Sequence, residues 1–176
     1  MDQAPPDAAA SPAPAAATPQ QMMIVNAQYL KDLSFENPRS PQTLLAQREA
    51  PAVSLNVDVK ARSLGPEVYE VVLTIAAEAR QGDDPVFLVE LAYAAVVTLR
   101  QAPPDVVPLL VFIETPRMMF PFARAIIASA TRDGGFPPLL INPIDFAELL
   151  RREHARAAKD QDGQGLQPPP IPPASA

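Results

Sequence analysis

Side chains that could do catalytic chemistry are scarce in this chain. The only histidine, His154, has Glu153 and Arg156 as neighbours in a polar stretch, where a histidine is normally a surface residue. A histidine base needs an enclosed, oriented partner, and a zinc site needs several histidine or thiolate ligands, which a chain without cysteine and with one histidine lacks. We therefore expect no enzyme, no metal site and no cofactor.

Two further motifs are only superficially similar to sites. Gly134-Gly135 lacks the lysine and the strand–loop–helix order of a phosphate-binding loop, so these glycines predict the end of a helix. Asp83-Asp84 supplies two carboxylates, which are too few for a closed calcium site. Together with Gly82 they indicate a hairpin turn.

Binding is the chemistry that the remaining residues favour, and the first candidate set is acidic. Asp32 and Glu36 share one face of an alternating stretch, and Leu88 and Glu90 share one face of another. Scattered surface carboxylates are usually only solvated surface. The alternative is a docking surface for a basic partner, with Leu88 as an apolar anchor among the charges.

The second candidate set is apolar. Leu44 and Leu45 are the only large apolar residues in the long segment 39–51, and Phe146, Leu149 and Leu150 form a stripe on the last expected helix. The two leucines either close the edge of the core or, if their segment lies beside that helix, wall a groove with it. Such a groove would hold extended polypeptide through apolar contacts and backbone hydrogen bonds, with little sequence preference.

Strands must position most of these residues. Apolar and polar residues alternate in four segments, which predicts strands over residues 23–36, 52–61, 68–80 and 85–99. In the first segment, strict alternation puts Tyr29, Lys31 and Leu33 on one face and Asp32 and Glu36 on the other.

Helices follow the strands. Residues 106–114 predict a helical turn or two, and residues 117–132 predict a helix with a kink or a late start at Pro121. After the glycines and a proline pair, Asn142 is expected to cap the last helix, with Pro143 in its first position.

This order of elements indicates the fold class. Strands followed by helices favour an α+β fold, here a four-stranded antiparallel sheet, Greek-key-like with a long first crossover, and helices packed on one face. The third and fourth strands are apolar on both faces, whereas helices can cover only one. We therefore expect a homo-oligomer.

Composition indicates the limits of the folded domain, the classes of partner and the cellular compartment. Residues 1–21 are rich in Ala and Pro and residues 161–176 in Pro, so we expect both to be disordered around one domain of residues 22–160. A net charge of −6 disfavours nucleic acid and anionic membranes as partners. No basic residue precedes Lys31 and no apolar run could span a bilayer, so neither a signal peptide nor membrane insertion is expected. The absence of cysteine is compatible with the cytoplasm.

Four segments in the same order along the chain are similar to the SecB family of protein-export chaperones. They read YLKDLSFENP (29–38), VYEVVL (68–73), MMFPFAR (118–124) and GGFPPLLINPIDF (134–146). The resemblance implies a cytoplasmic homotetramer, a dimer of dimers. Such a protein binds unfolded precursor proteins, keeps them translocation-competent and delivers them to the SecA ATPase, using neither ATP nor metal itself.

The resemblance also implies roles for individual residues. It assigns the SecA-docking surface to Asp32, Glu36, Leu88 and Glu90. It assigns the client groove to the loop with Leu44 and Leu45 and the helix with Phe146, Leu149 and Leu150. It makes Val89, Leu91 and Tyr93 candidates for contacts between subunits. The crossover loop lacks the Trp or Phe expected there, so its client contacts would be aliphatic.

Two other functions remain open. The same fold could serve one dedicated client, as in a toxin–antitoxin pair, although the retained acidic residues argue against this. It could also carry a small ligand in the groove, and the purified protein would then hold that ligand in stoichiometric amount.

Overall fold

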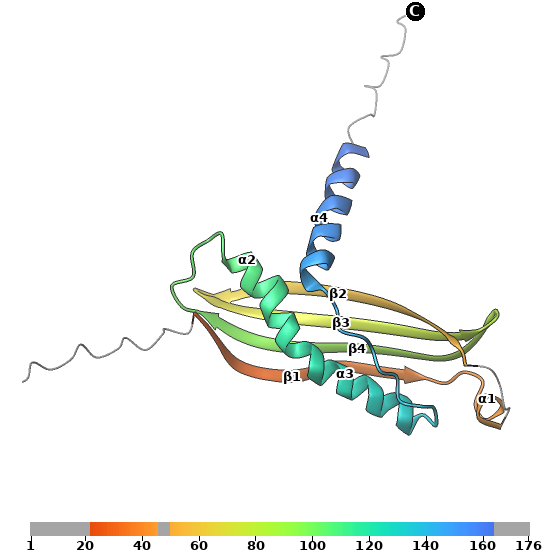
Figure 1. The fold of residues 1–176 in the computed structure, drawn as a ribbon. Helices are drawn as coiled ribbons and strands as arrows, with labels where there is room; N and C mark the ends of the chain where they lie inside the picture. The colour runs from red at the N-terminus through yellow and green to blue at the C-terminus, as the bar shows by residue number, and fades with distance from the viewer. Residues whose placement is uncertain (1–21, 46–49, 164–176) are drawn as a thin grey trace, which may run out of the picture.

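The protein consists of an antiparallel sheet with helices over one of its faces (Figure 1). The structure is a computed structural model that describes residues 22–45 and 50–163. Its four strands lie close to the predicted ranges: β1 spans Met23–Glu36, β2 Ala52–Gly65, β3 Val68–Gln81 and β4 Asp84–Leu99. The α+β class with a four-stranded sheet is therefore confirmed.

The order of strands in the sheet is β1-β4-β3-β2, which confirms the Greek-key arrangement. β2, β3 and β4 form a meander of two hairpins, and β1 pairs antiparallel with β4, so that β1 and β2 are the edges. The crossover from β1 to β2 contains a short helix, α1 (Gln42–Leu45), that the sequence pattern did not predict. A salt bridge between Arg39 and Asp84 fastens this crossover to the β3–β4 hairpin.

The helical layer begins where residues 106–114 predicted it. α2 (Val107–Leu109) continues through a π-helical turn, η1 (Leu110–Glu114), into α3 (Thr115–Asp133). The predicted late start at Pro121 is wrong, because α3 passes through this proline. The turns before it are already anchored by the buried side chains of Val111 and Ile113, which offset the lost backbone donor and the ring contact with the preceding turn that an interior proline brings.

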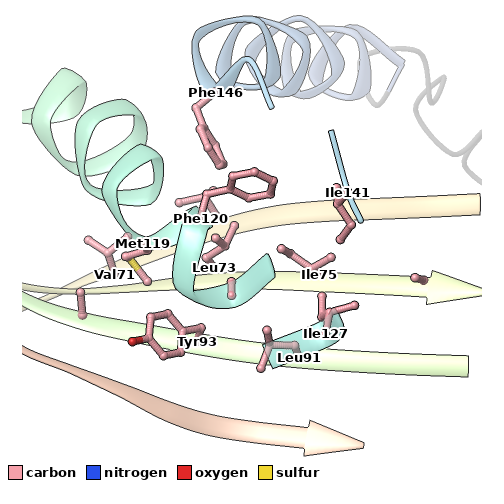
Figure 2. Close-up of a cluster of buried hydrophobic side chains, with 14 of the residues drawn as sticks. Val71, Leu73, Ile75, Leu91, Tyr93, Met119, Phe120, Ile127, Ile141 and Phe146 are labelled. Atoms are coloured by element: carbon pink, nitrogen blue, oxygen red, sulfur yellow. The ribbon is translucent and has the colours of Figure 1, made fainter. Parts of the chain in front are cut away.

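The core lies between the sheet and α3 (Figure 2). Odd-numbered residues of β3 and β4 point toward the helices, and among them Leu73, Ile75 and Leu91 are 0–1% exposed. They meet Met119 and Ile127 of α3, both fully buried. The opposite face carries the even-numbered residues 88–98 of β4; no helix of the described residues lies over it (Figure 1), and we call it the open face.

The predicted glycine stop of α3 is confirmed. The amide of Gly135, at φ +89°, donates to the Arg132 carbonyl at 3.0 Å, and the amide of Phe136 donates to the Thr131 carbonyl at 3.1 Å. This is the pattern of a Schellman motif, which needs a left-handed residue at the position of Gly135.

The predicted cap of the last helix is wrong. α4 (Phe146–Gly163) begins three residues later than expected, and Asp145 caps it by accepting a hydrogen bond from the Glu148 amide at 3.0 Å. This bond and the Ala147 amide lower the pKa of the Asp145 carboxyl. Phe146 anchors the first turn of α4 on Phe120, and the helix then leads away from the sheet, so α4 does not pack flat on it as expected (Figure 1).

The domain limits stay a prediction. α4 reaches Gly163, beyond the expected limit at residue 160, whereas residues 1–21 and 164–176 lie outside the described residues.

Two bulges in β1 correct the predicted faces of this strand. The register against β4 shifts between Val25 and Ala27 and again between Leu30 and Asp32. Each bulge inserts one extra residue and reverses the alternation beyond it. Tyr29 and Asp32 consequently lie on the same face, where strict alternation separates them.

Candidate functional site

The structure brings all four residues of the acidic set together. In the register of β1 and β4, Asp32 is opposite Ala92 and Glu36 is opposite Leu88, while Glu90 is opposite the residue between them. Residues opposite one another point to the same side of a sheet. Asp32, Glu36, Leu88 and Glu90 therefore share the open face, and we call this group the docking patch.

The carboxylates of the docking patch are unpaired. Within the described residues, Asp32, Glu36 and Glu90 have neither a hydrogen-bond nor a salt-bridge partner. Other acids of the same sheet are neutralised, since Glu78 pairs with Arg80 and Asp84 with Arg39. Three unpaired carboxylates on one face with a leucine make a negative surface that attracts a basic partner.

A second polar group lies farther along the open face, around Glu70 of β3. Its carboxylate is 3% exposed and accepts hydrogen bonds from the Tyr29 hydroxyl, from Arg62 Nε at 2.5 Å and from Lys31 Nζ at 3.0 Å. These donors, in that order of effect, hold the pKa of Glu70 at about 2, below its ordinary 4.5. We call these four residues the Glu70 cluster. Sequence reasoning missed it, although an acid within the apolar run VYEVVL was a signal.

An apolar cavity of about 500 Å³ opens beside the crossover. Its walls come from the crossover, the start of β2, the β3–β4 hairpin and the segment that follows α3. The residues are Thr43, Ala50, Pro51, Val53, Gln81, Val86, Phe87, Phe136, Pro137, Pro138 and Leu139. Phe87 and Phe136 contact each other at a centroid distance of 5.0 Å, and Phe35 stacks on Phe87 at 5.8 Å. The aromatic surface that the crossover lacks is thus supplied by its neighbours.

The structure does not bring the predicted apolar set together. Leu44 and Leu45 are 44% and 81% exposed on α1, which lies beyond one end of the sheet, whereas α4 rises away from over the middle of the sheet (Figure 1). Phe146 is 1% exposed in the core, so the expectation that it lines a groove is wrong for its side chain. Leu149 and Leu150 are half-buried against the same core. The segment with Pro137 and Pro138, rather than α4, lies beside the crossover.

Leu149 instead borders a second cavity, of about 710 Å³, between β2 and α4. Leu55 and Asp58 of β2 and Glu153 of α4 also line it. Burial, followed by the nearby charge of Asp58, raises the pKa of the Glu153 carboxyl. The apolar cavity and this second cavity are neighbours along β2, because Val53 lines the first and Leu55 lines the second.

The residues expected between subunits lie elsewhere. Val89, Leu91 and Tyr93 are 0%, 1% and 9% exposed beneath α3, so they offer no surface to a second chain, and this assignment is wrong. The large exposed apolar side chains nearby are Leu30 of β1 at 50% and Phe122 of α3 at 51%. Phe122 stacks on Tyr93 at a centroid distance of 6.4 Å.

Metal and membrane sites do not emerge from the described residues. In this part of the chain, no three His, Cys, Asp or Glu side chains gather as a metal would require. None of its helices has the combined length and hydrophobicity of a membrane span. His154 is exposed on α4, as expected.

Comparison with known proteins points to one family. Residues 16–157 match the family model of SecB, the preprotein translocase subunit. A protein-export protein SecB of Rhodospirillum centenum is 51% identical over 132 residues, covering 74% of this chain and 79% of that relative. The SecB of Maricaulis maris is 48% identical, covering 89% and 91%. Among solved structures, a SecB-like chaperone of Mycobacterium tuberculosis in complex with an antitoxin peptide has the same fold, with a TM-score of 0.56, 13% identity and coverage of 70% and 88%.

Proposed function

Because this chain belongs to the SecB family, we propose that it is an export chaperone that binds unfolded precursor proteins, keeps them translocation-competent and hands them to the SecA ATPase. The observation that carries the proposal is the docking patch, in which Leu88 shares the open face with three unpaired carboxylates of β1 and β4. We place this activity in the cytoplasm and in the single domain of residues 22–160.

The docking patch is proposed to bind a basic surface of SecA. Asp32, Glu36 and Glu90 would attract and orient that surface, and Leu88 would provide the apolar contact that a purely ionic encounter lacks. The opposite face of the sheet is occupied by α3, so a partner on the open face leaves the helical side free for clients.

Charge reversal tests this docking. Glu36→Arg should abolish binding of purified SecA, measured by calorimetry or surface plasmon resonance, and should leave client binding intact. Asp105→Arg is the matched control, because Asp105 is exposed without a partner in the described chain and lies outside the sheet. Equal SecA binding by both variants would refute the docking patch and favour a chaperone dedicated to one client.

The client groove is proposed to run along β2. Val53 borders the apolar cavity and Leu55 borders the cavity under α4. Both side chains lie on the helical side of the strand and are 40% and 47% exposed. Leu44 and Leu45 extend this surface at the crossover end, and Leu149 extends it toward α4. An extended client segment of six residues would cover about 20 Å of it.

Suppression of aggregation tests the groove. Wild type should prevent aggregation of a protein diluted from urea, without nucleotide, and Leu55→Asp should reduce this protection. Leu64→Asp is the matched control, since Leu64 lies on the same strand and is 48% exposed but lines neither cavity. Equal protection by the two variants would show that clients bind elsewhere.

A homotetramer, built as a dimer of dimers, is part of the proposal. The unpaired edge of β1 and the exposed Leu30 and Phe122 on the helical side are the surfaces that support it. Light scattering after size exclusion should give four times the chain mass of 18.9 kDa. Phe122→Glu should give smaller species, and a wild-type monomer would refute the assembly.

A further inference from the structure

The second bulge of β1 determines which way the docking patch faces. Leu30 is opposite Tyr93 and Asp32 is opposite Ala92, so Lys31 is the extra residue at this point. Without it, the alternation that directs Tyr29 to the open face would turn Asp32 and Glu36 toward the helices. The acidic residues of β1 therefore depend on a single irregular position just before them in the strand.

The Glu70 cluster holds this irregular position. Lys31, the bulged residue, and Tyr29, two residues before it, both donate to the same oxygen of Glu70. Glu70, on β3, is opposite Val96 and Tyr29 is opposite Ala94, so these side chains reach diagonally across β4, where Ala94 is 0% exposed although it belongs to the open face. Arg62 of β2 holds the other carboxylate oxygen. One carboxylate thus links side chains from both edges of the sheet.

The apolar residues of β1 do not hold the bulge by themselves. Leu33 and Phe35 point to the helical side and fix the strand beyond the bulge, but Leu33 is 38% exposed and next to the bulge Leu30 is 50% exposed. Polar contacts to Glu70 are the interactions that this stretch makes on the open face. These contacts join residues of this chain that lie outside the docking patch, so forming them does not require a partner.

We propose that Glu70 is a positioning residue for partner docking, which fixes the β1 bulge through Lys31 and Tyr29 and so holds Asp32 and Glu36 beside Leu88 and Glu90. This inference rests on the proposed function, because it concerns the same docking patch. Glu70 itself is 3% exposed, so its proposed role is to position other residues and not to contact the partner.

Two variants separate positioning from charge. Glu70→Gln keeps the size of the side chain but releases Lys31, and it should weaken SecA binding roughly tenfold, the equivalent of two exposed ion pairs. Tyr29→Phe removes one hydrogen bond to Glu70 without changing any charge, and it should weaken binding about two- to threefold. Glu114→Gln is the charge-matched control, because Glu114 pairs with Arg117 in the helical layer, and it should bind as wild type.

A double-mutant cycle supplies the decisive readout. If Glu70 acts by orienting Asp32 and Glu36, then Glu70→Gln should add no loss in a chain that already carries Asp32→Asn and Glu36→Gln. Amide hydrogen exchange over residues 29–36 should accelerate in Glu70→Gln, while suppression of client aggregation stays unchanged.

Each outcome has a definite meaning. Wild-type binding by Glu70→Gln and Tyr29→Phe, or a loss that adds fully on the doubly substituted background, would overturn the inference and leave the docking patch in place. A wild-type protein that does not bind SecA would instead refute the proposed docking, and the inference would fall with it.

Discussion

Gly134 is a position where one methyl group should have a large effect. A Cβ built on Gly134 would lie 2.3 Å from Cε1 and Cζ of Phe35. Carbon atoms in contact are normally about 3.5–4.0 Å apart, so the ring or the end of α3 would have to move by more than about 1 Å. The backbone is not the obstacle, because φ of Gly134 is −72°.

The ring has little freedom to move away. Phe35 stacks on Phe87 at 5.8 Å and lies 6.4 Å from Phe136. Overpacking of this kind typically costs 1–3 kcal/mol, and a ring fixed on two sides places Gly134→Ala near the upper end, at about 2–3 kcal/mol. Urea unfolding followed by circular dichroism, at one protein concentration, measures this loss.

A control and a rescue make the result interpretable. Gly65→Ala meets nothing within 4 Å and Gly65 has no positive φ, so its stability should stay within about 0.5 kcal/mol of wild type. Phe35→Leu should relieve the clash, so that the double variant is more stable than the sum of the single effects by about 1 kcal/mol or more. A Gly134→Ala protein as stable as Gly65→Ala would refute the assigned packing.

Three other substitutions have defined outcomes. The pKa of Glu70 is lowered from 4.5 to about 2, so its contribution is present above pH 4.5 and lost as the pH falls toward 2. This pKa shift corresponds to at most about 3 kcal/mol of folding stability, and the solvent exposure of Lys31 and Arg62 reduces that contribution to about 1–2 kcal/mol. In urea unfolding, Glu70→Gln should therefore be less stable than wild type at pH 7, and this difference in stability should shrink at pH 3. Asp145→Ala should lower the stability and reduce the helical circular dichroism, whereas Asp145→Asn, which keeps the capping oxygen, should not. Phe146→Ala should lower the free energy of unfolding by about 3–5 kcal/mol in the same experiment. The control Leu45→Ala, at an exposed position, should lower it by less than about 0.5 kcal/mol.

Strand positions were predictable because a half-buried strand has a period of two residues. The faces of β1 were not, because Lys31 and Asp32 are both polar and either could point away from the core. The bulge at Lys31 places both on the open face, and the partner of Lys31 there, Glu70, is far along the chain, so no local pattern carries that information.

The cap of α4 was missed for a local reason. Asn142-Pro143 has the form of a helix start, but Asp145 with Glu148 three residues later has it as well, and the structure uses the second. The grouping of the four docking-patch residues was predictable because Asp32 and Glu36 lie in the regular stretch of β1 beyond its second bulge, and Leu88 and Glu90 lie in β4. The groove was not, since its walls depend on how the crossover and the segment after α3 meet.

The Greek-key order of the strands has a consequence for synthesis of this protein. β1 is made first among the described strands, yet its neighbour in the sheet, β4, is made last. At 5–20 residues per second, the interval from Glu36 to Asp84 lasts roughly 2–10 s. The local hairpins of β2, β3 and β4 are the contacts that form fastest, and the distant pairing of β1 closes the sheet. During that interval the nascent chain exposes an unpaired strand with one apolar face, the same kind of segment that its clients present.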